Sequence, residues 1–464
     1  MKFSLLSVSY DDAERKSGLY GAIPDLMIDK LVDAFEPNYM RAENFLRVLR
    51  ESPRAENIAY RQGILQDFLD NRQLLDDLTE SFKSYDDMRR DWQELRSALG
   101  TYSSLKATAD FVADTLSHFT AVRGLTEGYI LRSEGLNALR SWLLETSDGD
   151  AIRELTEICS LWSRDSIADY EWRLSISLNE VLRLDLASVS EVAEITETAL
   201  LKRIFTKKTD DSAIDLGEFH SDEARAMLGG AIDEVYFTLT TIAGALYEIF
   251  RGLSAELDFY VTAVNFVEYL RKSSMSAVFP SVEGSEIDIK SVYDPLLIVE
   301  GLGKSRIIRN DFKPGKTANL IIRGENAAGK TGFLRAIGIS VIFASAGLPV
   351  CAESAAIAHF SGVFTQFSKA ETLSSLDESG RFEQEVRELS EIVGKELNGA
   401  LILLNETFQS TSYSEASSAI VKVLRRMENS GARWIFVTHL SSLLESPPAS
   451  ASVAVMENFR FCAT

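Results

Sequence analysis

The sequence predicts an α + α/β protein, in which a long and mostly helical region precedes an α/β region. No proline lies between Pro53 and Pro280, and proline interrupts helices, so its long absence favours helix. From Ser281 onward, short β-branched runs alternate with helical segments, which is typical of an α/β domain with a largely parallel sheet. Because 464 residues are too many for one typical core, we expect two domains, 1–280 and 281–464.

In the helical region, apolar residues recur in steps of three and four, as they do along the buried face of a helix, apart from one wider step between Phe68 and Leu74. The two clearest stripes are Ile64, Phe68, Leu74, Leu75, Leu78 and Phe82, and then Leu253, Leu257, Val261 and Val264. We interpret both stripes as core between packed helices.

One short segment interrupts the helical pattern. Apolar and other residues alternate over 173–178 and again over 182–186, and this period of two predicts a small β-element. Shortly after it, the densest basic cluster of this half is Lys202, Arg203, Lys207 and Lys208. Acidic residues follow at once, so a solvated loop of mixed charge fits this cluster better than a binding patch.

In the α/β region, we expect strands at four apolar runs. These are Ile287–Ile289, Leu320–Ile322, Leu401–Leu404 and Trp434–Val437. The second run leads into the pattern G-x-x-x-x-G-K-[ST], and Phe333, Leu334 and Ile337 follow at helical spacing. The order strand, glycine loop, helix is the context of a P-loop, which we favour over a plain glycine-rich turn.

Four residues of this loop are of types that suit the binding of a phosphate chain with Mg²⁺. Gly324 and Gly329 let the backbone N–H groups face a phosphate chain. Lys330 can reach the β- and γ-phosphates, and the Thr331 hydroxyl can ligate Mg²⁺. The helix that starts here adds partial positive charge at the same place.

A nucleotide hydrolase also needs an acid at the end of a second buried strand. The run 400–404 ends in Asn405 and Glu406. Asn405 is a neutral oxygen donor where a metal-supporting carboxylate is usual, and Glu406 is placed to orient or deprotonate an attacking water. The next strand ends at His439, which can sense a γ-phosphate. The plainer alternatives are a strand that ends in a polar turn and an ordinary histidine.

Charge and cysteine usage limit the classes of function. The net charge of −21 argues against a protein whose whole surface grips DNA, because phosphate contacts require basic residues. DNA contact would need a local basic patch or a clamp that encircles DNA; otherwise nucleic acid is not the partner.

Cys159, Cys351 and Cys462 lie far apart, without disulfide or CxxC spacing. We find no signal-peptide pattern and no membrane span, and expect a cytoplasmic protein.

Over about residues 285–460, the chain resembles the ATPase domain of the MutS mismatch-repair family, which is ABC-type. The loop Gly324–Thr331 is similar to the family's "G-P-N-M-G-G-K-S", and Asn405-Glu406 to its "D-E". The other similar segments, in chain order, are Asp294-Pro295-Leu296, Asn310-Asp311, Arg335, Ala346–Ala352, Val363–Gln366, Ser379–Phe382 with Glu385, Ser410–Ser412, and Thr438-His439. Upstream, Ile58–Leu65 and the helix around Leu257-Asp258 resemble the family's helical core and lever, so the first half is expected to be that domain.

The resemblance implies a site for ATP or ADP with Mg²⁺, shared by two subunits of a homodimer. The residues implied for nucleotide binding are Gly324, Asn326, Ala327, Ala328, Gly329, Lys330, Thr331 and Gly332, with Ser379 and Gly380 from the second subunit. Glu406, His439 and Lys330 are implied for hydrolysis, and Thr331 and Asn405 for Mg²⁺.

Two departures from the family lead to two hypotheses. No mismatch-reading domain or C-terminal nuclease domain is evident, and Asn405 replaces an aspartate. The leading hypothesis is an ATP-driven dimeric switch or clamp that binds DNA in repair or recombination without reading mismatches itself. The alternative is a nucleotide-binding regulatory scaffold with little or no hydrolysis and a protein partner. The sequence names neither the DNA structure nor the partner.

Overall fold

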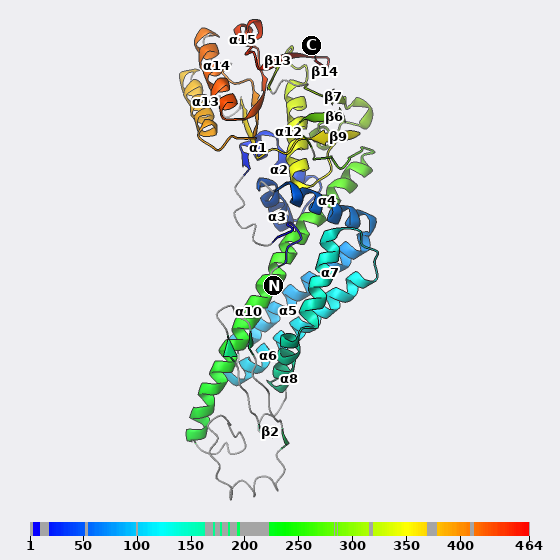
Figure 1. The fold of residues 1–464 in the computed structure, drawn as a ribbon, viewed down its shortest axis with the longest axis vertical. Coiled ribbons are helices and arrows are strands. Elements are labelled where there is room, and N and C mark those ends of the chain that lie inside the picture. The colour runs from blue at the N-terminus through cyan, green and yellow to red at the C-terminus, as the bar shows by residue number, and fades with distance from the viewer. Residues whose placement is uncertain are drawn as a thin grey trace, which may run out of the picture. The chain divides into compact units, whose positions relative to one another are not determined.

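The computed structural model confirms an α + α/β chain (Figure 1). It describes residues 3–9, 18–51, 54–98, 101–162, 170–171, 177–178, 184–185, 193–194, 222–282, 284, 286–314, 319–368, 378–408 and 413–463. Contacts divide the chain into two compact units. The helical unit comprises Met1–Phe3, Asn71–Arg132 and Leu136–Ser254; the sheet unit comprises Ser4–Asp70, Ser133–Gly135 and Ala255–Thr464.

The helical unit is built from long helices around an aromatic core. Its helices are α5 (Arg72–Ala98), α6 (Thr101–Glu127), most of α7 (Glu134–Ser147), α8 (Asp150–Trp162) and the first part of the 51-residue α10 (Asp222–Lys272). Tyr85 stacks on Phe250 with ring centroids 4.1 Å apart, and Trp92 stacks on Phe111 at 4.5 Å. Among the described helices, none combines the length and apolarity needed to cross a bilayer.

Both predicted apolar stripes are buried, as expected of helix core. Ile64 and Phe68 belong to α4 (Ala55–Asp70), and the rest of the first stripe lies on α5. The second stripe lies on α10. Helices α4 and α5 are separate at Asn71, where the predicted stripe takes its one wider step.

The predicted β-element is confirmed in its described part. Strand β3 (Ser177–Leu178) pairs antiparallel with β4 (Leu184–Asp185), and β2 (Tyr170–Glu171) pairs antiparallel with β5 (Ala193–Glu194). The basic cluster from Lys202 to Lys208 lies outside the described residues.

The sheet unit contains a seven-stranded sheet in the order β1-β10-β11-β12-β8-β13-β14. Every pair is parallel except the last, β13 with β14. The strands are β1 (Leu19–Tyr20), β8 (Asn319–Arg323), β10 (Val363–Phe367), β11 (Leu401–Asn405), β12 (Arg433–Val437), β13 (Ala451–Glu457) and β14 (Arg460–Ala463). The predicted strands at 320–322, 401–404 and 434–437 are therefore confirmed as β8, β11 and β12.

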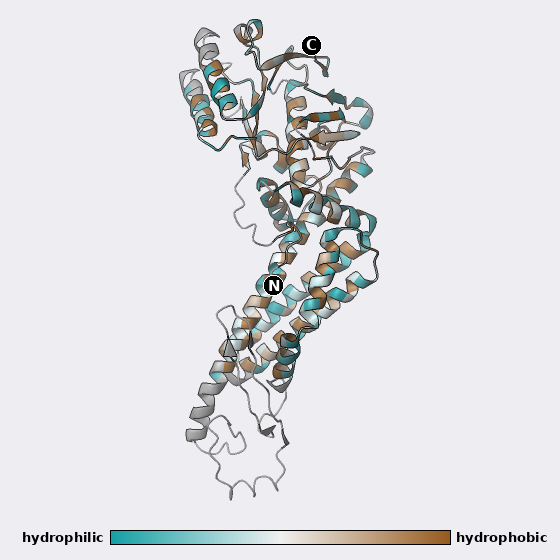
Figure 2. Ribbon diagram, in the orientation of Figure 1, coloured by the Kyte–Doolittle hydropathy of each residue, from teal (hydrophilic) through white to brown (hydrophobic). Residues whose placement is uncertain are grey.

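Helices cover the two faces of this sheet. On one face, α12 (Lys330–Ala346) contacts β10, β11 and β12. It is buried over almost its whole length and is brown in the hydropathy colouring of Figure 2. The other face packs on α13 (Glu378–Val393) and α14 (Tyr413–Asn429), in one apolar cluster that includes Ile402 and Trp434. The carboxyl ends of the central parallel strands therefore meet at one edge, where ligands bind in such sheets.

A second sheet of three antiparallel strands, in the order β7-β6-β9, completes the sheet unit. Its strands are β6 (Ile287–Val292), which contains the predicted run 287–289, β7 (Asn310–Phe312) and β9 (Ser354–Ile357). The short elements of the unit are α1 (Ala22–Asp25), α2 (Ile28–Asp33), α3 (Tyr39–Arg50), α11 (Leu296–Val299), the 3-10 turn η1 (Lys304–Arg306) and α15 (Ser441–Glu445).

The N-terminal segment contributes directly to the large sheet. Strand β1 lies parallel to β10, with Leu19 opposite Val363 and Tyr20 opposite Phe364. The sheet unit therefore extends across the predicted boundary at residue 280 and takes in Ser4–Asp70. The functional division into a core or lever domain and an ATPase domain stays a prediction.

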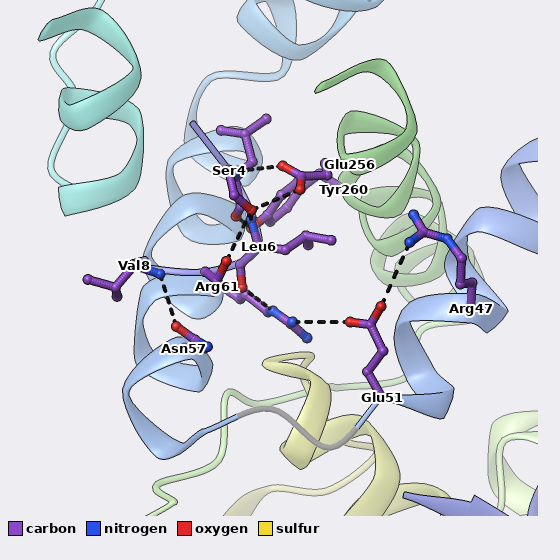
Figure 3. Close-up of polar contacts among 11 residues, drawn as sticks. Ser4, Leu6, Val8, Arg47, Glu51, Asn57, Arg61, Glu256 and Tyr260 are labelled. Atoms are coloured by element: carbon purple, nitrogen blue, oxygen red, sulfur yellow. Dashed lines mark hydrogen bonds and ion pairs between the residues drawn. The ribbon is translucent and has the colours of Figure 1, made fainter. Parts of the chain in front are cut away.

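Residues 4–8 form a strap between α4 and α10 within the same unit (Figure 3). Glu256 on α10 accepts hydrogen bonds from Ser4 Oγ at 2.8 Å and from the backbone N–H of Leu5 at 2.6 Å. Arg61 on α4 donates from Nε to the carbonyl of Leu6 at 2.8 Å. Asn57 accepts from the N–H of Val8 at 3.0 Å. The buried leucines 5 and 6 add apolar contact to these polar ones.

Candidate functional site

The glycine loop joins β8 to α12 at the carboxyl edge of the large sheet. A Cβ on Gly324 would overlap the carbonyl oxygen of Met456 on β13, so only glycine fits there. Gly329 has a φ of 89° and is the N-cap of α12, and a Cβ there would lie 2.6 Å from Phe459 Cδ1. Ala327 also has a positive φ, 63°. The loop thus has a tightly curled backbone in front of a helix N-terminus.

Lys330, the first residue of α12, is folded into this loop. Its Nζ donates to the backbone carbonyls of Gly324 at 2.9 Å and Glu325 at 2.8 Å. It lies 3.0 Å from His439 Nε2 and 3.8 Å from Glu406 Oε1. Burial lowers the pKa of Lys330, and the charge of Glu406 opposes this shift.

The three polar residues at the carboxyl ends of β11 and β12, Asn405, Glu406 and His439, lie around the same loop. The hydroxyl of Thr331 donates to Asn405 Oδ1 at 3.3 Å. His439 Nε2 lies 3.5 Å from Glu406 Oε1. Glu406 has a φ of 58° and donates its backbone N–H to Val437 at 2.9 Å, which fixes it between the ends of β11 and β12.

The structure therefore brings together five of the candidate site residues, Lys330, Thr331, Asn405, Glu406 and His439. Asn326, Ala327 and Ala328 lie on the loop itself, and Asn326 is exposed. Gly332 lies in the first turn of α12. Ser379 and Gly380 are in the first turn of α13, and only their backbone is described; the segment Ser410–Ser412 lies outside the described residues.

Two hollows flank the loop. The first is a groove of about 800 Å³, which the loop lines together with His439 and residues 455–459. The second is a cavity of about 350 Å³ with a mostly apolar wall that includes Gly329, Gly332, Ile308 and Phe459. A polar loop with an apolar cavity beside it suits a ligand that has a charged chain and a flat apolar group.

The hairpin between β13 and β14 is part of this site, and sequence reasoning missed it. Phe459 donates its N–H to the carbonyl of Ala328 at 3.1 Å, which ties the hairpin to the glycine loop. Asn310 holds the hairpin from the other side: its Nδ2 donates to the Phe459 carbonyl at 3.1 Å and its Oδ1 accepts from Phe461 N at 2.8 Å. The paired residues Asn458 and Phe459, both with positive φ, gave no periodic signal.

A buried ion pair supports the first turns of α12. Asp294 accepts from Arg335 Nε at 2.8 Å and also pairs with Arg335 Nη2. Burial raises the pKa of Asp294, while Arg335 lowers it. The carboxylate also lines the apolar cavity, close to Gly332.

The residues present fit a nucleotide with Mg²⁺. The loop that contains Gly324 and Gly329 curls in front of the N-terminus of α12, where backbone N–H groups can face a phosphate chain. The Thr331 hydroxyl and the Asn405 amide oxygen are hard oxygen donors, and they lie within hydrogen-bond distance of each other. No group of three or more His, Cys, Asp or Glu within the described ranges could hold a metal by itself. This suits Mg²⁺, which proteins usually bind through few side chains together with substrate phosphates.

Comparison with known proteins agrees with these observations. The family model for MutS domain V matches residues 320–461, and the model for the MutS2 N-terminal domain matches residues 54–273. The DNA mismatch repair protein MutS of Lactococcus lactis is 24% identical over 454 residues, which cover 86% of this chain and 52% of the relative.

Two further relatives match shorter stretches. Endonuclease MutS2 of Halothermothrix orenii is 26% identical over 213 residues, 45% of this chain and 26% of the relative. The DNA mismatch repair protein MutS of Chlorobium chlorochromatii is 32% identical over 165 residues, 35% of this chain and 19% of the relative. The chain thus spans about half the length, or less, of these curated relatives. Because models of the same family match both of its regions, the chain belongs to the MutS family.

Proposed function

We propose that the chain is an ABC-type ATPase that works as a dimeric, DNA-binding switch or clamp in repair or recombination. The observation that carries the proposal is the convergence of Lys330, Glu406 and His439 within 3.8 Å of one another at the glycine loop. A carboxylate beside a phosphate-binding lysine is what hydrolysis needs, whereas a protein that only binds nucleotide has no use for it.

Each residue has a role in this proposal. The loop is the P-loop, or Walker A segment, and Lys330 exchanges the carbonyls of Gly324 and Glu325 for the oxygens of the β- and γ-phosphates. Glu406 orients the attacking water and accepts its proton. Asn326 and His439 contact the γ-phosphate and report its presence. Thr331 and Asn405 hold Mg²⁺, which when bound neutralises charge on the phosphates.

The first test separates binding from hydrolysis. Lys330→Ala is expected to abolish ATP binding, and Glu406→Gln is expected to keep binding but lose turnover. Lys313→Ala removes an exposed lysine that pairs with Asp288, and serves as the control that leaves both unchanged. Equilibrium binding of a fluorescent ATP analogue and steady-state phosphate release measure the two properties. Unchanged turnover in Lys330→Ala would remove the glycine loop from the mechanism.

The second test concerns the dimer. In the proposed assembly, two chains enclose two ATP molecules head to tail, and each glycine loop faces Ser379 and Gly380 of the other chain. Sedimentation of Glu406→Gln with ATP is expected to show a dimer. A strictly monomeric species at saturating ATP would refute the shared site.

The third test concerns DNA. Nucleotide state is proposed to move the helical levers, which hold DNA. ATPase rates measured with duplex, branched and single-stranded DNA are expected to rise with at least one of them. Binding should weaken with salt, because phosphate contacts release counterions. Binding that is independent of salt would contradict this mode of contact.

A second function is supported by two observations. Asn405 stands where a metal-supporting carboxylate is usual, and the net charge is −21. Both favour a regulatory scaffold that binds nucleotide, hydrolyses little and contacts a protein. ATP binding without Mg²⁺-dependent turnover, and without affinity for any DNA in the panel, would select this alternative.

A further inference from the structure

We propose that Asp25, in the N-terminal segment, is a positioning residue for the ATPase reaction; this inference rests on the function proposed above. Asp25 ends α1, directly after the strand that extends the large sheet. It lies 340 positions before the residue that it contacts on β10. No motif of the glycine-loop region includes it.

Asp25 fixes the carboxyl end of β10. Its Oδ2 accepts a hydrogen bond from Thr365 Oγ1 at 2.7 Å and another from the backbone N–H of Phe367 at 3.3 Å. These two residues flank Gln366, whose side chain points to the opposite face because successive residues of a strand alternate. Gly21, with a φ of 71°, permits the approach, since a Cβ there would lie 2.7 Å from the Thr365 carbonyl.

Gln366 links the carboxyl end of β10 to Thr407, the residue that follows Glu406. Its Oε1 accepts from the hydroxyl of Thr407, and its Nε2 donates to Glu388 Oε2 at 3.3 Å. Both Gln366 and Thr407 are buried. Thr407 directly follows Glu406, so a bond to Thr407 limits how the backbone of Glu406 can turn.

Glu406 depends on such support because its backbone is strained. It has a φ of 58°, and Phe408, two residues on, has a φ of 65°. Non-glycine residues in this region persist only where neighbouring contacts hold them. The supports are Val437, which accepts from Glu406 N at 2.9 Å, Gln366 through Thr407, and Glu385, which accepts from Phe408 N at 2.9 Å. Asp25 acts on the second of these.

The expected consequence is a change in kcat with little change in KM. The hydrogen bonds of Asp25 described above go to β10, and not to the glycine-loop residues that would bind the phosphates. Loosening Glu406, however, displaces the carboxylate that orients water, and a shift of about 1 Å in a catalytic group can lower the rate about 100-fold. Asp25→Ala is therefore expected to lower kcat about 10- to 100-fold at nearly unchanged KM.

The experiment compares the steady-state ATPase activity of the full chain in six forms: the wild type, four single variants and the double variant Asp25→Ala/Thr365→Val. Asp25→Asn keeps an acceptor oxygen and is expected to restore most of the activity that Asp25→Ala loses. Thr365→Val removes the same hydrogen bond from the other side without changing the shape, and stands in if Asp25→Ala does not fold. Asp29→Ala removes an exposed carboxylate that accepts a local hydrogen bond from Lys30 N, and should match the wild type.

The outcomes are distinct. Lower kcat in both Asp25→Ala and Thr365→Val, with no further loss in the double variant, supports the proposal, since residues in one network are not additive. Folded Asp25→Ala or Thr365→Val with wild-type kcat, even with a lower melting temperature, overturns it. A wild type without turnover, when Lys330→Ala still loses ATP binding, overturns the hydrolysis proposal and this inference together but leaves nucleotide binding standing.

Discussion

Gly324→Ala tests whether the shape of the glycine loop depends on its contact with β13. The added methyl group would overlap the carbonyl oxygen of Met456 and lie 3.2 Å from its carbonyl carbon. Both are backbone atoms of a strand paired on two sides, so they cannot move aside as a side chain would. Overpacking of this kind costs about 1–3 kcal/mol, and we expect the upper part of that range.

The assay is denaturant unfolding of the two variants Gly324→Ala and Gly303→Ala, followed by circular dichroism. Gly303 is the matched control, because it has a φ of −69° and no atom within 4 Å of an added Cβ. Its replacement should change the free energy of unfolding by no more than about 0.5 kcal/mol. Gly324→Ala should also weaken ATP binding, because the loop must shift away from Met456.

Equal stability of the two glycine variants would refute this reasoning. It would mean that β13 and the loop can separate without cost, and that the tight contact does not define the loop. Loss of stability with unchanged ATP binding would leave the packing argument standing. It would refute only the expectation that the loop backbone is the surface that binds ATP.

Three further predictions concern the support of the site. Burial raises the pKa of Glu385 above its ordinary value of 4.5, so the stability that its protonated form contributes is present below that value and is lost as pH rises through the raised pKa. Glu385→Gln stays neutral and should therefore gain stability relative to the wild type as pH rises from 4 to 8. A stability difference that is constant with pH would contradict this. Asp294→Ala leaves Arg335 without its buried carboxylate and should cost about 3–5 kcal/mol, measured by urea unfolding; a loss below about 1 kcal/mol would show that the pair is not needed. Ile402→Ala, in the centre of the sheet, should cost about 2–5 kcal/mol in the same assay, whereas Ile130→Ala, at a side chain that is 87% exposed, should change stability little.

Much of the sheet unit could be predicted from the sequence, because its signals are local. The predicted runs 320–322, 401–404 and 434–437, which lie in β8, β11 and β12, are short, apolar and buried throughout. Parallel strands of this kind place their carboxyl ends at one edge, so the residues after them meet. This rule accounts for the proximity of Lys330, Glu406 and His439, which follow or end different strands of the sheet.

The rest of the site could not be predicted, because it depends on contacts between distant segments. Phe459 reaches the glycine loop through a hairpin whose two turn residues have positive φ. Asp25 meets Thr365 through a strand of only two residues. Neither a single turn residue nor a two-residue strand produces a periodic pattern, so only the folded backbone reveals them.

The pairing of β1 with β10 sets an order of events during synthesis. The two partners are separated by about 340 positions, so at about 5–20 residues per second the first waits roughly 20–70 s for the second. Until then β1 has no partner strand. Without β1, β10, which is buried at every position, would have an uncovered edge that another chain could pair with. A recombinant fragment of residues 281–464 would keep that edge permanently, and should aggregate unless residues 18–27 are supplied with it.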